Sequence, residues 1–278
     1  MARLIDTNEL RPDFRLGGVM RRLAPGGTGI FAHRELWATL AHLDLRNRYR
    51  GSFLGPLWLT IATGVLVAGI GLLYGGLFRQ PLETYLPYVA VSLVAWTLIS
   101  STITEAAVLF PGEGIVLKQL PVPSTIFTIR LVYRNLLAFA HNLIIVAIVY
   151  AIYPDDLSAT ALFVLISFPF LVVNLWWVSV VVSLTAARFR DIPPIVVSAL
   201  QILFFVSPIV WSAEDLPSRT LFVSFNPLYH LIESVRAPLT EGEVPWTSFG
   251  FSVGCALVGS LLALHLLAWA RTRLVYWL

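Results

Sequence analysis

Charged residues crowd against the first long apolar run of the chain, in the stretch DLRNRYRGSFLGPLW at residues 44–58. The stretch opens with one acid and three arginines: Asp44, Arg46, Arg48 and Arg50. No further charge occurs until Arg79. Arginines gathered at the end of an apolar run are typical of the cytoplasmic edge of a membrane span. The stretch therefore predicts where the chain meets the membrane surface.

Two opposite charges lie inside apolar runs rather than beside them. Glu105 is about one turn from the cytoplasmic end of the second run, and Arg134 is about one turn into the third. A charge at the bilayer centre costs roughly 2.5–3.5 kcal/mol on insertion scales. In an antiparallel hairpin the two side chains can face each other and offset much of that cost. Separate snorkelling of each side chain toward cytoplasmic water is an equal alternative.

Sequence motifs for catalysis are missing. The chain has no G-x-x-x-x-G-K-[ST] phosphate loop, no H-E-x-x-H, no C-x-x-C and no G-x-S-x-G. His141 and His265 lie in apolar runs, where a proton relay is conceivable, but a hydrogen-bonded packing role is favoured. We therefore expect a non-enzymatic chain with no cofactor and no metal ligands of its own.

Composition indicates what kind of protein carries these charges. Hydrophobic residues make up 57% of the 278 residues, charged residues only 13%, and the mean hydropathy is +0.78. Soluble domains carry roughly 25% charged residues, so most of this surface must face something other than water. The single cysteine, Cys255, lies in an apolar run, so no disulfide forms within the chain. The composition predicts an integral membrane protein.

Six apolar runs are long enough to cross a hydrocarbon core of about 30 Å. They lie near 55–78, 86–109, 131–153, 160–186, 192–211 and 248–270. Backbone facing lipid must satisfy its own hydrogen bonds, so these runs predict helices and an all-α fold. We divide the chain into a flexible cytoplasmic tail (1–30), an amphipathic interface helix (31–52) and a six-span membrane domain (53–278). The loop 212–247 is broken by Pro227 and predicts short re-entrant helices at the outer surface.

Lysine and arginine set the orientation of these spans. Nine of the 19 precede the first span: Arg3, Arg11, Arg15, Arg21, Arg22, Arg34, Arg46, Arg48 and Arg50. Seven more fall on the same side: Lys118, Arg130, Arg134, Arg188, Arg190, Arg271 and Arg273. The other side holds Arg79, Arg219 and Arg236. Both termini are therefore expected in the cytoplasm.

Glycines and aromatic residues in the spans each allow two interpretations. Gly64, Gly71 and Gly75 permit close helix approach, either between subunits or within the chain. Aromatic side chains at span ends form an interfacial belt by default, whereas deeper ones can stack on sugar rings. The candidates for lining a conduit are Trp58, Tyr74, Trp96, Phe204 and Phe205.

Five short motifs in a fixed order resemble a known family. They are RELWATLAHLDLRNRYRGSFLGPLW, LFPGEGIVLKQLPVPSTI (109–126), RFRDIPPIV (188–196), FFVSPIVW (204–211) and NPLYHLIESVR (226–236). From residue 31 onward the chain resembles the permease subunits of ABC-2 type exporters, most of all the polysaccharide group of Wzm-like O-antigen and TagG-like teichoic-acid permeases. The family often has Asn at the position of Gly112 or Glu113, so the turn there departs from the pattern.

The resemblance implies partners and roles. It implies a homodimer in the bacterial inner membrane with a separate ATPase subunit, in two copies, which binds ATP and Mg. The implied cargo is a lipid-linked glycan, and nucleic acid is not an implied partner. The implied ATPase-coupling residues are Arg34, Glu35, Asp44, Pro111, Glu113 and Lys118. Arg46, Arg48, Arg50 and Tyr49 would attract the anionic head of the cargo at a cytoplasmic entrance, and Gly64, Gly71 and Gly75 would lie at the dimer interface.

Other functions compete with this one. An ABC-2 exporter of a drug or another lipid would have the same architecture. An ion- or proton-coupled carrier would need Glu105 and would be indifferent to ATP, but acids nearer the membrane midplane are missing. A membrane-embedded transferase would need a polar catalytic group at the membrane face, and the sequence presents none convincingly.

Overall fold

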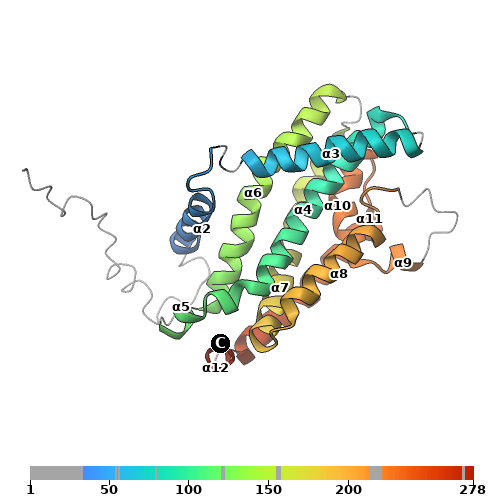
Figure 1. Cartoon of the computed structure of the whole chain (residues 1–278). Coiled ribbons are helices and arrows are strands. Elements are labelled where there is room, and N and C mark those ends of the chain that lie inside the picture. The colour runs from blue at the N-terminus through green and yellow to red at the C-terminus, as the bar shows by residue number, and fades with distance from the viewer. Residues whose placement is uncertain are drawn as a thin grey trace, which may run out of the picture.

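The computed structural model describes residues 34–53, 55, 57–78, 80–119, 123–154, 158–212, 221–270 and 273–278, and all regular structure in these ranges is helical (Figure 1). The predicted all-α fold is therefore confirmed. The predicted tail, 1–30, lies outside the described residues. Of the predicted interface helix, the structure describes α2 (Arg34–Arg48), which packs against α6.

Five helical stretches are long and apolar enough to cross a membrane. They are α3 (Leu57–Phe78), α4 (Leu82–Gly112), α6 (Ser124–Ile152), the pair η3 (Ala159–Phe163) and α7 (Val164–Arg188), and α11 (Trp246–Ala270). Each coincides with a predicted span. Helix α4 extends beyond its predicted limits at both ends, and α6 begins earlier than predicted, at the end of the bundle where α4 finishes. Short helices α5 (Gly114–Gln119) and α12 (Leu274–Trp277) lie at that end of the bundle (Figure 1).

The fifth predicted span, 192–211, is shorter than expected. Its helix, α8, covers Ile192–Val206, and the chain becomes extended at Ser207. Pro208 follows, and a proline at that position disfavours continuing the helix. Fifteen residues rise only about 22 Å, less than the hydrocarbon core of about 30 Å. The span 192–211 is thus a short helix followed by a bent, non-helical segment, in which the Ile209 N–H donates to the Ser207 carbonyl at 2.8 Å.

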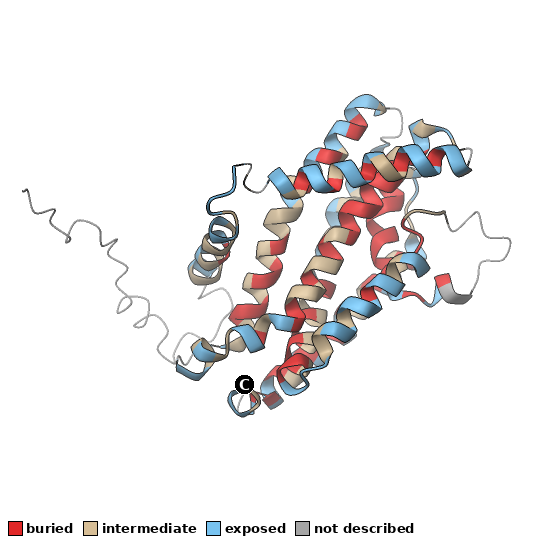
Figure 2. Cartoon of the chain, in the orientation of Figure 1, coloured by how far each residue is buried: buried red, intermediate tan, exposed pale blue. Residues whose placement is uncertain are grey.

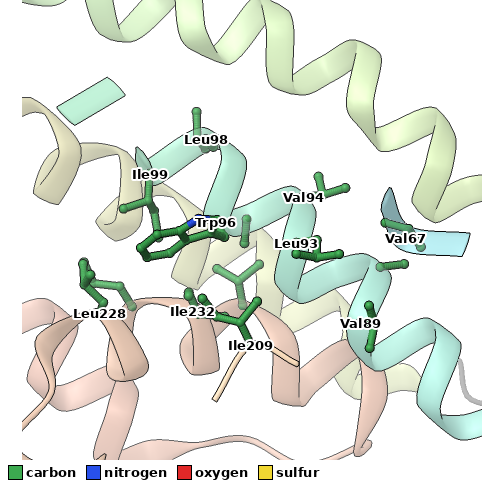
Figure 3. Close-up of a cluster of buried hydrophobic side chains, with 14 of the residues drawn as sticks. Val67, Val89, Leu93, Val94, Trp96, Leu98, Ile99, Ile209, Leu228 and Ile232 are labelled. Atoms are coloured by element: carbon green, nitrogen blue, oxygen red, sulfur yellow. The ribbon is translucent and has the colours of Figure 1, made fainter. Parts of the chain in front are cut away.

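Helix α4 is the centre of the bundle. It packs against α3, α6, α7, α8 and α10 (Pro227–Thr240), and its buried residues run along most of its length (Figure 2). Figure 3 shows side chains of α4, among them Leu93 and Ile99, directed toward Ile209 and toward Ile232 of α10. The other long helices keep one broad apolar face exposed, as expected for contact with lipid.

The loop between the last two spans folds back into the bundle. It contains α9 (Leu221–Ser224) and α10, while 213–220 lie outside the described residues. The Asn226 side chain caps α10 by accepting from the backbone N–H groups of Leu228 and Tyr229. The expected short helices of the 212–247 loop are present, and α10 lies inside the bundle, because it packs against α4, α7 and α11 and is largely buried.

Helices α7 and α11 approach each other at a glycine. A Cβ placed on Gly259 would lie 2.3 Å from two atoms of the Trp177 ring. That ring is fixed by a hydrogen bond of 2.8 Å from its Nε1 to Asn174 Oδ1, and Asn174 Nδ2 donates to the Ser252 carbonyl at 2.9 Å. Small residues are what permit such close helix packing in lipid, where no hydrophobic force drives association.

We predict that Gly259→Ala destabilises the protein by about 1–3 kcal/mol, because the added methyl group overpacks the contact with Trp177. Unfolding in mixed detergent micelles measures the change. Gly254→Ala is the matched control on the same helix, since nothing lies within 4 Å of its added Cβ. Equal stability of the two variants would contradict the prediction.

Candidate functional site

Six charged side chains form one network at the end of the bundle where α4 ends and α6 begins. Three are acids and three are arginines: Asp44, Glu105, Glu113, Arg48, Arg130 and Arg134. They come from α2, from α4 and its end, and from α6, so three segments far apart in sequence meet here. Their charges sum to zero, which is how arginines can be held at the edge of a low-dielectric region.

Arg130 connects two of these segments. Its Nε and Nη2 donate to the two oxygens of Asp44, each at 2.6 Å, in a bidentate pair. Its Nη1 lies 3.2 Å from Glu113 Oε1, at the end of α4. The guanidinium of α6 therefore holds α2 and the α4–α5 turn at the same time.

Arg134 and Glu105 form the pair that the sequence offers as one of two alternatives. Arg134 Nη2 donates to Glu105 Oε2 at 2.7 Å, and Nη1 donates to Asp44 at 3.1 Å. Asn135 Nδ2 donates to the same Glu105 oxygen at 2.8 Å. The helix pair is thus bonded across α4 and α6, and independent snorkelling is excluded for these two side chains.

Arg48 joins the network from the end of α2. It pairs with Glu105 Oε1. Burial acts to lower the pKa of Arg48, but the hydrogen bond and charge of Glu105 outweigh it and raise the pKa above its usual value. Arg48 therefore stays charged, and it also remains 45% exposed.

A second buried cluster lies at the opposite end, around Arg236 of α10. The Arg236 side chain is 2% exposed and lies over the Tyr88 ring, 4.1 Å from its centroid. Its Nη2 pairs with Glu233, and its Nη1 donates to the Pro208 carbonyl at 2.6 Å and to Ser92 Oγ at 3.2 Å. Tyr85 and Tyr88 donate to the carbonyls of Val210 and Trp211 at 2.6 and 2.9 Å. These bonds satisfy the extended backbone that follows α8.

Two cavities lie on either side of α4. One, of about 440 Å³, is lined by Arg48, Tyr49 and Trp58, together with residues of α4 and α6. The other, of about 310 Å³, lies between α4 and α8 and is lined by Trp96, Phe204 and Phe205. The ring centroids of Trp96 and Phe204 are 5.6 Å apart, and those of Phe204 and Phe205 are 5.3 Å apart. Tyr74 lies away from both groups, four residues before the end of α3.

The sequence of this chain matches a known protein family. Residues 35–240 match the family model described as ABC-2 type transporter. The chain belongs to the ABC-2 type transporter family. It is also 26% identical over 223 residues to an O-antigen export system permease protein RfbA of Myxococcus xanthus, covering 78% of this chain and 84% of that protein. Two proteins of the same name from Klebsiella pneumoniae are 23% and 24% identical, over 76% and 75% of this chain and 82% and 81% of theirs.

An ABC-2 permease is a multi-pass membrane protein, and membership in the family implies an ABC ATPase partner. The predicted coupling residues divide into two groups in the structure. Arg34, Glu35, Pro111 and Lys118 are exposed at the surface of α2, α4 and α5. The carboxylates of Asp44 and Glu113 instead turn inward onto Arg130. The second group can act on an ATPase contact through the position of α2 and of the α4–α5 turn.

The predicted entrance residues also separate. Arg46 and Arg50 are exposed, whereas Arg48 pairs with Glu105 and lines the 440 Å³ cavity with Tyr49. The conduit residues fall into three places: Trp58 in that cavity, Trp96 with Phe204 and Phe205 in the other, and Tyr74 near the far end of α3. The structure therefore does not bring all five aromatic residues to one surface of this chain.

The predicted glycine face of α3 lies against other helices of the same chain. Cβ atoms on Gly71 and Gly75 would lie 2.3 Å and 3.3 Å from Leu86 and Leu82 of the same chain, and Gly64 faces Ile145 of α6. Gly71 and Gly75 are buried in this packing. Gly71 and Gly75 therefore pack within the chain, while a role of this glycine face at a dimer interface stays a prediction.

The sequence analysis missed two arginines that organise the structure. Arg130 and Arg236 counted only as markers of topology. For Arg236, a signal was present: Glu233 lies three residues earlier in PLYHLIESVR, among apolar neighbours, and an acid–arginine pair at that spacing lies on one face of a helix. For Arg130, the partners come from segments distant in sequence, and no local pattern reveals them.

We predict that Asp44→Asn loosens α2, because Arg130 and Arg134 lose a shared carboxylate. Losing hydrogen bonds to charged groups costs roughly 1.5–3 kcal/mol, and partial exposure favours the lower end. Hydrogen exchange of the α2 amides should rise about tenfold. Arg46→Gln, an exposed change on the same helix, should leave that exchange unaltered. Unchanged α2 protection in Asp44→Asn would show that the network does not hold this helix.

Proposed function

We propose that this chain is the non-catalytic permease subunit of an ATP-driven exporter that moves a lipid-linked polysaccharide, such as an O-antigen, across the bacterial cytoplasmic membrane. It works as a homodimer with two copies of a cytoplasmic ATPase subunit, which bind ATP and Mg. Both termini lie in the cytoplasm, as the lysine and arginine distribution favours.

The observation that carries the proposal is the double attachment of Arg130. The two segments that contact the ATPase by resemblance to the family are α2 and the α4–α5 turn. Arg130 binds Asp44 in the first and Glu113 at the second. A displacement of either segment by the ATPase is therefore transmitted to α6 and, through Arg134 and Glu105, to the central helix α4. Such linked, rigid elements are suited to coupling hydrolysis with opening of a conduit.

The cargo assignment rests on the relatives and on the aromatic residues. Three relatives carry the name of O-antigen export permeases, and the match covers more than four fifths of each. Trp96, Phe204 and Phe205 gather between α4 and α8, and aromatic faces can stack on sugar rings. A second copy would meet α3 on its exposed surface, which includes Val65, Leu72 and Leu73.

Purification of the tagged chain from its native membrane tests the ATPase partnership. We expect an ABC ATPase subunit to be recovered with it. Charge reversal at two exposed coupling positions, Arg34→Glu with Lys118→Glu, should reduce recovery of the ATPase about tenfold, because these side chains face the cytoplasm. Arg190→Glu, in a cytoplasmic turn with no assigned contact, is the control. Recovery of the unaltered chain without any ATPase, under conditions that preserve complexes, would contradict the proposal.

The exposed entrance arginines allow a separate test of the cargo. Arg46→Glu with Arg50→Glu reverses two charges outside the ion network, so folding is preserved and an anionic headgroup is repelled. We expect surface glycan to fall at least about tenfold, measured on whole cells against the amount of permease in the membrane. The Arg190→Glu variant should export normally. Normal surface glycan in the double variant would remove these two residues from the entrance.

A further inference from the structure

The 440 Å³ cavity between α3, α4 and α6 has mostly apolar walls, but one polar atom among its lining residues has no partner. Apolar wall residues include Leu59 and Ala62 of α3 and Phe139 of α6, and polar residues project between them from α4 and α6. The three helices pack against one another, and α3 crosses α4 and α6 in the view of Figure 1. The end of α2 reaches them through the pair between Arg48 and Glu105. The volume is in the range of small-molecule sites, which start near 300 Å³.

Of the residues that line this cavity, Asn142 is the one with a buried side-chain atom that lacks a hydrogen-bond partner. It lines the cavity, its residue is 2% exposed, and its Oδ1 has no hydrogen-bond partner in the structure. A buried acceptor without a donor costs roughly 1–3 kcal/mol. Asn135, two turns earlier on the same face of α6, differs because Nδ2 donates to Glu105 and to the Leu131 carbonyl. Asn142 therefore needs a donor from a molecule in the cavity.

Two hydroxyl groups that line the cavity can also accept a hydrogen bond. Thr97 Oγ1 donates to the Leu93 carbonyl at 2.8 Å, and Ser101 Oγ donates to the Leu98 carbonyl at 3.2 Å. A hydroxyl has one hydrogen and two lone pairs, so both groups keep acceptor capacity once their hydrogen is used. With Asn142 Oδ1, the cavity presents acceptors from α4 and α6. A ligand carrying several O–H donors complements them.

The mouth of the cavity adds a positive charge and aromatic rings. Arg48 is 45% exposed and has five N–H donors, so it can pair with Glu105 and still bind an anion. Tyr49 and Trp58 line the same mouth. This combination fits a phosphate at Arg48 with hydroxyl groups reaching inward toward Asn142.

A third cavity, distinct from the two described above, is entirely apolar. It has a volume of about 250 Å³, shares Phe139 with the first, and is lined only by apolar residues such as Val94, Val146 and Leu165. An apolar cavity can stay empty without leaving a polar group unpaired. Of the Asn142 cavity and this apolar cavity, only the Asn142 cavity is lined by a side chain that lacks a hydrogen-bond partner.

We propose that the Asn142 cavity binds the hydroxylated headgroup of an anionic lipid, with the phosphate at Arg48 and hydroxyl groups donating to Asn142, Thr97 and Ser101. Such a headgroup can come from a glycerol-bearing phospholipid of the bilayer or from a sugar attached to a polyprenyl diphosphate. The second source rests on the proposed export function, and the first does not.

Native mass spectrometry of the purified full-length complex tests the assignment with two matched lipid pairs. Phosphatidylglycerol is compared with phosphatidylmethanol, which keeps the negative phosphate but lacks the glycerol hydroxyls. Polyprenyl-diphosphate N-acetylglucosamine is compared with polyprenyl diphosphate. We expect at least one hydroxylated member to bind about tenfold tighter than its counterpart. Preference within the first pair identifies a bilayer phospholipid, and preference only within the second identifies the cargo.

Three variants connect that preference to the cavity. Asn142→Leu removes the acceptor at similar volume, and Ala138→Leu fills the cavity from another position of its wall while retaining Asn142. Each should abolish the tenfold preference. Val146→Leu, on the same helix but lining the apolar cavity, should retain it. The two independent variants keep the test decisive if one of them fails to fold.

Lack of preference in both lipid pairs, or preference that survives both cavity variants, would overturn the assignment and leave water as the partner of Asn142. A complex without an ATPase that still prefers phosphatidylglycerol would instead overturn the export function while the lipid site stands.

Discussion

An arginine guanidinium cannot remain in or beside hydrocarbon without oxygen atoms to receive its donors. Two arginines under this constraint organise opposite ends of the bundle. Arg130 binds Asp44 and Glu113 at the end where α6 begins, and Arg236 binds Glu233, Ser92 and the Pro208 carbonyl at the other. Both sets include positions on or next to α4. The central place of α4 in the packing follows, because partners at each of its ends are fixed by charge as well as by apolar contact.

This arrangement separates the chain into parts with different mechanical character. The network around Arg130 joins α2, α4 and α6 through side chains that are partly exposed, so solvent weakens its ion pairs relative to a fully buried cluster. The Arg236 cluster is buried, and breaking it would leave a charge without partners, at a cost of about 3–5 kcal/mol for buried pairs. In a permease, motion imposed from the cytoplasm would therefore reach a stiffer outer half that retains its packing.

Much of the fold could be predicted because membrane spans are set by length and hydropathy. The five long helices lie where apolar runs place them, and the Glu105–Arg134 pair follows from two charges at matching depth in neighbouring antiparallel spans. The partner against which each helix face packs is harder to predict from the sequence than the position of the helix. In sequence, the α3 glycines suit a subunit contact and an internal contact equally, and the internal contact of Gly71 with Leu86 becomes visible only in the folded structure. Likewise, the apolar run at 192–211 gives no sign that its last residues leave the helix to bond with Tyr85 and Tyr88.

The early end of α8 has a consequence for the membrane itself. A helix about 22 Å long beside others that exceed 30 Å creates a hydrophobic mismatch on one side of the bundle. Lipids next to a short apolar segment compress, and the bilayer thins locally to match it. We expect this thinning beside Phe205 and Ile202, whose side chains are exposed on α8. A polar molecule passing along α8 would then have less hydrocarbon to cross than one passing along α7.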